Sequence, residues 1–314
     1  MLPPNTLPSL FILAGLVGGC TAGVGGESRD PSFSRTDIAT PADGVAFVDA
    51  DGTVAATGAS ERIAADEPYY HPERLYAVVL VEEDDVLNVR AGAGTTHPIV
   101  QTLGPESVEL TASGRQEMVG TQRWVEILLP GSRSGWVNSF YLTEMVPPAS
   151  FCGDSQVQDL LVELEMALRE QSGERLFGVV SPRHGLTVQV VPRGRLHRFD
   201  DTEARGLFSS RESIDWGTHP YTGEALRGSF ADVVAPDLSA VVEHPNTSDT
   251  CNTMELGGHA YDATFPTELA NFNYYSLHFA GTAEYSNMDW STWIVGVEYS
   301  EGVPYVASLT HFAR

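Results

Sequence analysis

The sequence predicts a multidomain chain in which a small all-β barrel precedes an α+β domain, and three observations lead to this prediction. Six strand-length runs follow one another at close spacing between residues 76 and 143. A helical period of apolar residues begins after the proline-containing stretch at residues 145–150. Residues 290–312 then alternate as a β-hairpin. With 314 residues, the chain is long enough for two globular units, because domains cluster near about 100–150 residues.

The strand signal is clearest in residues 86–90, whose letters are VLNVR. In an extended chain Leu87 and Val89 point to one side, and Val86, Asn88 and Arg90 point to the other. Glycines in the AGAG turn that follows allow the positive φ that a tight reversal needs. The close spacing of the next runs predicts a small, strongly bent barrel over residues 75–147.

Three stretches of this region are similar to the motifs of bacterial SH3 (SH3b) domains: LNVRAGAGTTHPIVQTL, RWVEILL and GWVNSFYL. They occur in the order and at the spacing found in that family. The resemblance implies an SH3-like barrel that serves as an accessory module in an envelope protein. Such modules hold cell-wall peptide or glycan, or a protein partner.

A shallow aromatic groove is the expected ligand site of such a module. His97, Trp124 and Tyr141 are the candidate groove residues. Trp136 follows a glycine at a strand start, so we expect its ring in the core. Burial of Trp124 and Tyr141 in the core is the competing interpretation, and the sequence leaves it open.

Residues 151–314 are expected to form the α+β domain, with one main helix on an antiparallel sheet. The helix has an apolar face made of Val157, Leu160, Leu161, Leu164 and Leu168. Ser155 and Gln158 form a possible capping box at its start, and Gly173 is placed to end it. The terminal hairpin turns at residues 300–302, and residues 271–281 supply a third strand. This half of the chain resembles no family.

The first twenty residues predict export. An apolar run at residues 7–17 is too short to span a bilayer as a helix, and Val17-Gly18-Gly19-Cys20 resembles a bacterial lipobox. The resemblance implies a signal peptide at residues 1–19 and a lipid on Cys20. An ordinary signal peptide with a chance cysteine is the alternative, because no Lys or Arg precedes the apolar run. Residues 20–74 are rich in turn residues and are expected to form a flexible acidic linker.

The charge balance excludes several classes of function. The net charge is −24, so a nucleic-acid partner is not expected, and only the lipid anchor is expected to bring the protein to a membrane. The chain contains no lysine, which excludes Schiff-base chemistry and the P-loop lysine. The histidines show no zinc-site spacing. No metal or cofactor is therefore predicted.

Cys152 and Cys251 remain once Cys20 is assigned to the lipid, and an oxidising compartment favours a disulfide between them. The alternative is a catalytic thiol. Bacterial SH3 modules commonly accompany NlpC/P60 cell-wall peptidases, whose nucleophilic cysteine also opens a helix, and His184 is the candidate base for Cys152. The residues around Cys152 lack the signature of that family.

We therefore expect an exported, lipid-anchored envelope protein that binds cell-wall peptide or glycan, or an envelope protein, without catalysis. A cysteine-dependent cell-wall hydrolase is the first alternative. An adaptor, in which the SH3 unit only spaces a ligand-recognising C-terminal domain, is the second. Residues 212–230 are polar, aromatic and punctuated by glycine, which suits either a ligand-lining loop or an ordinary surface loop.

Overall fold

The computed structural model describes residues 70–219, 222–258, 260 and 263–313. Cys20, the signal peptide and most of the predicted linker lie outside these residues. Residues 70–74, the end of that linker, are described, and they are part of the fold. Tyr70 is buried in the core, and its hydroxyl donates to the carbonyl of Ser139 at 2.9 Å. The described residues belong to one compact unit, Ala64–Arg314.

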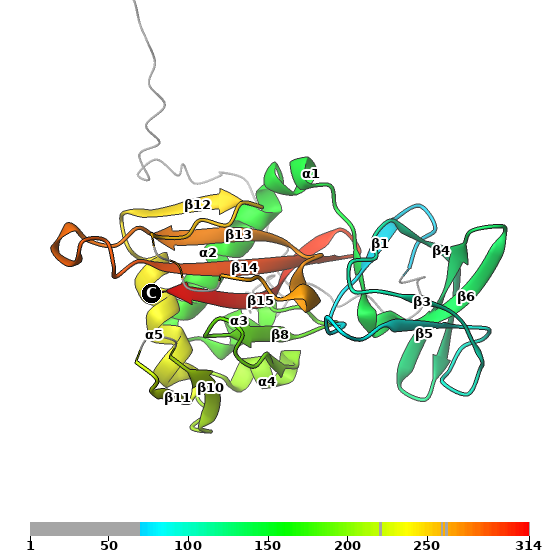
Figure 1. Cartoon of the computed structure of the whole chain (residues 1–314), viewed down its shortest axis with the longest axis horizontal. Helices are drawn as coiled ribbons and strands as arrows, with labels where there is room; N and C mark the ends of the chain where they lie inside the picture. Colours follow the sequence, from blue (N-terminus) through cyan, green and yellow to red (C-terminus); the bar gives the residue numbers. More distant parts are fainter. Residues whose placement is uncertain (1–69, 220–221, 259, 261–262, 314) are drawn as a thin grey trace, which may run out of the picture. The chain divides into compact units, whose positions relative to one another are not determined.

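The described chain is mostly β, and its first part is a curled antiparallel sheet (Figure 1). The sheet contains β1 (Leu75–Val78), β2 (Leu87–Arg90), β3 (Ile99–Leu103), β4 (Leu110–Val119), β5 (Gln122–Leu129), β6 (Arg133–Asn138) and β7 (Leu142–Glu144), with the short 3₁₀ helix η1 (Ser139–Tyr141) before β7. The strand order is β3-β2-β6-β5-β4-β1-β7. In β2, Leu87 and Val89 are buried and Asn88 and Arg90 are not, as the alternation predicts.

A second sheet of six strands forms the later part. Its strands are β8 (Leu186–Gln189), β9 (His197–Phe199), β12 (Thr247–Cys251), β13 (Asn273–Phe279), β14 (Ser291–Ser300) and β15 (Val303–Ala313), in the order β12-β13-β14-β15-β8-β9. The predicted hairpin and the third strand are β14, β15 and β13. The prediction of a wholly antiparallel sheet was wrong at one pair of strands, because β8 runs parallel to β15.

Helices cover one face of this sheet (Figure 1). They are α2 (Ser155–Glu170), α3 (Gly173–Val179), α4 (Asp201–Gly206) and α5 (Phe230–Val242), and a hairpin of β10 (Ile214–Thr218) and β11 (Ala225–Gly228) lies between α4 and α5. The prediction of one main helix was wrong, since α5 has 13 residues beside the 16 of α2. Pro236 lies inside α5. Proline is unusual in the interior of a helix, so the sequence pattern did not indicate a helix here.

The ends of α2 also differ from the prediction. Asp154 caps the helix by accepting from the Gln156 amide, whereas the Gln158 side chain donates to the Tyr275 hydroxyl at 2.7 Å. Gln171 ends the helix in a left-handed conformation, and Gly173 begins α3 instead. A Cβ on Gly173 would collide with the carbonyl oxygen of Arg205, so the glycine is needed for close packing.

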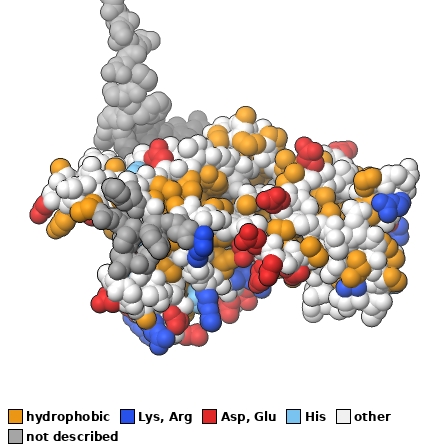
Figure 2. Space-filling view, in the orientation of Figure 1, with side chains coloured by type: hydrophobic (Ala, Val, Ile, Leu, Met, Phe, Trp, Pro, Cys, Tyr) orange, Lys and Arg blue, Asp and Glu red, His pale blue; other side chains and the backbone are white. Residues whose placement is uncertain are grey.

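The other face of the sheet is covered by the segment between β12 and β13. This segment contains the 3₁₀ helix η2 (Thr267–Leu269), and another, η3 (Ala283–Tyr285), precedes β14. Two small clusters form the core on this side, one around Leu269 and Phe272 and the other around Trp290 and Phe312. Figure 2 shows several acidic side chains over the middle of the face that it draws, and others near the edges of that face.

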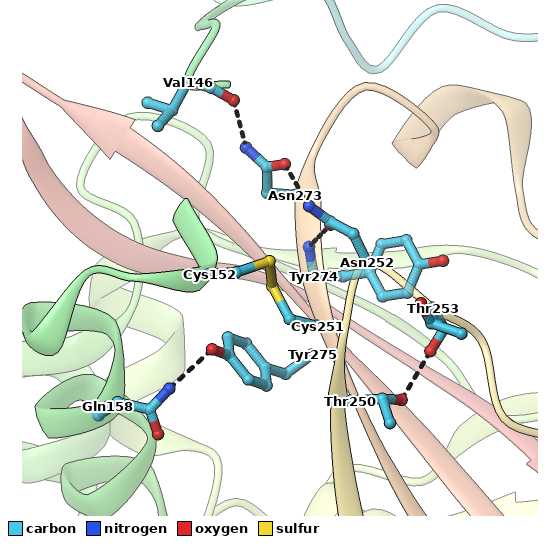
Figure 3. Close-up of a disulfide and its surroundings, with 10 residues drawn as sticks. All are labelled: Val146, Cys152, Gln158, Thr250, Cys251, Asn252, Thr253, Asn273, Tyr274 and Tyr275. Atoms are coloured by element: carbon cyan, nitrogen blue, oxygen red, sulfur yellow. Dashed lines mark hydrogen bonds between the residues drawn. A yellow bond between two sulfur atoms is a disulfide. The ribbon is translucent and has the colours of Figure 1, made fainter. Parts of the chain in front are cut away.

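A disulfide joins the start of the helical layer to the outer strand of this sheet (Figure 3). Cys152 is the last residue of α1 (Pro148–Cys152), which begins within the proline-containing stretch at residues 145–150, and Cys251 ends β12. Their Cα atoms are 5.7 Å apart. Asn273, which follows in β13, donates to the carbonyl of Val146 at 2.9 Å. The bond thus holds α1 against the edge of the sheet.

Removing the disulfide is expected to destabilise the protein strongly. It closes a loop with a sequence separation of 99, for which the chain-entropy model gives about 4–5 kcal/mol. Urea unfolding of the Cys152→Ala/Cys251→Ala double variant should show this loss. Dithiothreitol should destabilise the parent protein and leave the double variant unchanged. Equal effects of the reductant on both proteins would contradict the prediction.

Two glycine substitutions are expected to act in opposite directions. Gly185 has a φ of +70°, and a Cβ there would meet the carbonyl oxygen of Phe199, so Gly185→Ala should lower the free energy of unfolding by more than about 1 kcal/mol. Gly178 lies in α3 with open space around it, so Gly178→Ala should raise it by roughly 0.5–1 kcal/mol. Thermal denaturation of both variants tests the pair, and a stabilised Gly185→Ala protein would refute it.

Candidate functional site

A cavity of about 500 Å³ lies against the helix-covered face of the second sheet. The end of β8, the β10–β11 hairpin, α5 and the end of β15 enclose it. Its walls are largely apolar and include Val190, Val191, Pro192, Ala225, Leu226 and Val233. A concave apolar site with a few polar groups is the usual form of a small-ligand pocket.

His311 of β15 and Asp237 of α5 form the polar corner of the cavity. Trp293 lies opposite His311 in the β14–β15 ladder, and the two rings stack with centroids 4.6 Å apart. The Trp293 indole donates to Asp237 Oδ2 at 2.9 Å, and the same oxygen lies 3.1 Å from His311 Nε2. Trp293 therefore has two roles: its ring holds the His311 imidazole from the neighbouring strand, and its indole N–H orients the Asp237 carboxylate.

The contacts of the imidazole define its hydrogen positions. His311 Nδ1 lies 3.0 Å from the carbonyl oxygen of Val190, and a carbonyl only accepts, so this nitrogen carries a hydrogen. The Ser291 hydroxyl lies 2.9 Å from Nε2. Ser291 and Asp237 thus approach the same ring nitrogen. This is not the arrangement of a Ser-His-Asp triad, in which the two partners contact opposite nitrogens.

Burial lowers the pKa of His311 below its ordinary value of 6.5, and the nearby His219 lowers it too. The Asp237 carboxylate and the Val190 carbonyl oppose this shift. The Asp237 carboxylate and the Val190 carbonyl face the two ring nitrogens, so acceptor oxygens dominate this corner. Asp237 is 45% exposed and His311 is 12% exposed, so the carboxylate is the more accessible of the two. The corner suits a ligand that donates a hydrogen bond from an N–H or O–H group.

Two further charged groups line the cavity. Arg227 of β11 forms an ion pair with Asp215 of β10 at 3.0 Å. Asp232, in the first turn of α5, accepts from the Ser229 hydroxyl at 2.6 Å, and this hydrogen bond lowers the pKa of the carboxyl. The Ser229 hydroxyl thus favours the charged form of Asp232 at the rim.

Cys152 and His184, the residues of the alternative hydrolase interpretation, have other roles in the structure. Cys152 is in the disulfide and has no thiol to act as a nucleophile. His184 is 3% exposed, with Nδ1 2.5 Å from Glu298 Oε2 and Nε2 2.7 Å from the carbonyl oxygen of Phe140. Both ring nitrogens are therefore occupied, and His184 ties η1 of the first sheet to β14 of the second.

The three predicted groove residues lie on different parts of the first sheet. His97 is exposed in the β2–β3 turn, with its ring against Gly92. Trp124 of β5 is 3% exposed, so its ring is not offered to a ligand. Tyr141 is partly buried and contacts Phe140 edge to face at 5.2 Å. Within the described residues no ring contact joins these three. Trp136 is buried, as expected, with the Arg115 guanidinium 5.3 Å from its ring centre.

Sequence reasoning missed His311 and Asp237. Part of the site had a signal, because His219, Ala225, Leu226 and Arg227 lie in residues 212–230, the segment that suited either a ligand-lining loop or an ordinary surface loop. In the structure these four residues line the cavity. Nothing in the local sequence of α5 or β15 distinguishes Asp237 and His311 from solvated residues.

Comparison with known proteins adds no relative: no family model, no curated protein and no solved structure matches the chain. Among the described residues, no group of three His, Cys, Asp or Glu side chains is arranged to hold a metal ion. In the same part of the chain, no helix has the length and apolar character needed to cross a membrane.

The charges around His311 are expected to move its pKa in opposite directions. Asp237→Asn removes a group that raises the pKa and should lower it further, whereas His219→Asn should raise it. The unfolded chain binds a proton at a higher pH than folded His311, so stability should fall as the pH drops below 6.5 through the lowered pKa. An NMR titration of the imidazole tests both variants. Shifts of the same sign would contradict the assignment.

Proposed function

We propose that this chain is an exported, lipid-anchored protein of the bacterial cell envelope that binds cell-wall peptide or glycan and performs no catalysis. In this proposal residues 75–147 are an SH3b domain and residues 151–314 are an α+β ligand-binding domain. The lipid is carried by Cys20. The single observation that carries the binding function is the cavity under α5, with its apolar walls and its one acceptor corner.

The chemistry of that corner favours binding over hydrolysis. A serine hydrolase needs its hydroxyl in the cavity, with imidazole and orienting carboxylate on opposite sides of the ring. Ser291 is not among the described residues that line the cavity, and its hydroxyl contacts the same nitrogen as Asp237. The hydroxyl therefore serves to hold the ring, and the carboxylate is left to accept from a ligand.

The first sheet supports the SH3b assignment through its strand sequence. LNVR forms β2, RWVEILL lies in β5, and Gly135-Trp136-Val137 lies in β6, which pairs with both. The buried Trp124 argues against the groove of His97, Trp124 and Tyr141 as the ligand site. In the proposal the ligand therefore binds in the later half, and the SH3b unit supports and spaces it or contacts a protein partner.

Blocking the cavity is expected to abolish binding of cell-wall fragments. Ala225 is exposed on β11 and lines the cavity, so Ala225→Trp should fill it without disturbing the core. Isothermal titration of soluble fragments from digested cell wall into the full-length protein should show at least a tenfold loss of affinity. Glu224→Trp, on the adjacent residue outside the lining, is the matched control and should bind normally.

The same titration separates the two halves of the chain. His97→Ala removes the exposed aromatic candidate of the first sheet and should leave the affinity unchanged. If His97→Ala loses binding while Ala225→Trp keeps it, the fragments bind the first sheet and the cavity assignment fails. No binding by any of the four proteins would refute the proposed function.

A further inference from the structure

The β11 strand borders the cavity under α5 along its edge. Ala225, Leu226 and Arg227 are consecutive residues of β11, and all three line the cavity. Successive side chains of a strand point to opposite faces, so a cavity lined by three residues in a row runs along the edge of the strand and not over one face. Among the described strands β11 pairs with β10 alone. Its other edge therefore offers backbone N–H and C=O groups to the cavity.

An open strand edge is a binding site for an extended peptide. The peptide adds to the sheet as a further strand, and hydrogen bonds between the two backbones hold it in place. Side chains of such a peptide alternate between the two faces, so the walls beside the edge determine which side chains are accepted. A sugar has no repeating N–H and C=O groups with which to pair along a strand.

The walls of the cavity suit small aliphatic side chains. Among its twelve described lining residues, seven are aliphatic: Val190, Val191, Pro192, Ala225, Leu226, Val233 and Ala313. Burial of methyl groups against such walls is favourable, because it removes apolar surface from water. The ligand is therefore expected to carry side chains about as small as that of alanine.

A glycan fits the same walls poorly. Each sugar ring carries several hydroxyl groups, and a buried hydroxyl that loses its hydrogen bonds to water needs a new partner. No Ser, Thr, Asn or Gln is among the described lining residues, and the hydrogen-bonding side chains are limited to two His, two Asp and one Arg. An aromatic Phe, Tyr or Trp ring, on which the apolar face of a sugar could stack, is also absent from the described walls.

The charged groups select the end of the peptide that enters. Asp237 lines the cavity with 45% of its side chain exposed, and Asp232 lines it from the first turn of α5. Arg227, the one arginine among the described lining residues, pairs with Asp215 at 3.0 Å. An ammonium group beside Asp237 gains a charge-assisted hydrogen bond, whereas a carboxylate there would meet a like charge. An amino group is therefore favoured in this corner.

We propose that the cavity binds an extended peptide with small aliphatic side chains, aligned along the edge of β11 and carrying a free amino group at Asp237. The peptide backbone pairs with β11, its side chains pack against the aliphatic walls, and its ammonium pairs with the carboxylate. This inference rests on the proposed function, because it concerns the ligand of the same cavity. It selects peptide over glycan as the part of the wall that is recognised there.

Acetylation of the amino groups in the digested cell-wall fragments tests the role of the ammonium. Isothermal titration of the acetylated fragments into the full-length protein should show at least a tenfold loss of affinity relative to untreated fragments, because acetylation removes the positive charge. Unchanged affinity would overturn this inference and leave the proposed function intact. No binding of the untreated fragments would refute the proposed function, and this inference with it.

Defined probes separate peptide from glycan. Tetraalanine should bind the full-length protein, N-acetyl-tetraalanine should bind at least tenfold more weakly, and tri-N-acetylchitotriose should not bind at millimolar concentration. Ala225→Trp should abolish the binding of tetraalanine. Binding of the chitotriose that is lost in Ala225→Trp would assign the cavity to glycan and overturn the inference, as would failure of tetraalanine to bind.

Asp237→Asn separates a contact with the ammonium from a structural role. The variant keeps the shape of the side chain and removes its charge, so it should weaken tetraalanine at least tenfold and leave the affinity for N-acetyl-tetraalanine unchanged. Asp159→Asn, the same change at an exposed position of α2, is the matched control and should bind both peptides normally. Equal weakening of both peptides by Asp237→Asn would show that the carboxylate only supports the structure, and would refute the assignment of the amino group.

Discussion

A carboxylate buried in the middle of the second sheet constrains the rest of the structure. Glu298 lies on β14 with 1% of its surface exposed, and a buried charge without partners is strongly destabilising. The Ser181 hydroxyl and the His184 imidazole satisfy it. Because the second nitrogen of His184 then contacts the Phe140 carbonyl, one buried acid joins the sheet, the loop before β8 and the end of the first sheet. A substitution that removes any one of these groups leaves the remaining groups with a buried charge that lacks a partner.

Two cavities border the same strand, the one under α5 and a second one of about 740 Å³. β8 is short and pairs in parallel with β15, and the residues at its end alternate between the faces. Val190 borders one cavity and Gln189 the other. The carbonyl of Val190 also contacts the His311 imidazole, so the lining of both cavities depends on the position of this strand end. A one-residue shift of β8 would exchange the polar and apolar side chains that line the two cavities.

Much of the fold was predictable where the signal is local. The alternation in residues 86–90 and the turn at residues 300–302 gave the correct strands, because adjacent residues determine them. The β14–β15 register was not predictable. A regular ladder from the pair Ser300 and Val303 puts Thr310 opposite Trp293, but a bulge between Gly296 and Val297 puts His311 there instead. The polar corner therefore depends on a bulge that the sequence does not mark. The parallel β8–β15 pair and the contact of Asp237 with His311 are also long-range, and one sequence carries no record of them.

The parallel pairing of β8 with β15 also determines the order in which the molecule can assemble. Thr187 meets Ser308 only after more than a hundred intervening residues have been made, and α4, the β10–β11 hairpin and α5 all lie between them. During synthesis the apolar residues of β8 emerge before β15, the strand with which β8 pairs in parallel. This part of the sheet therefore forms late and slowly.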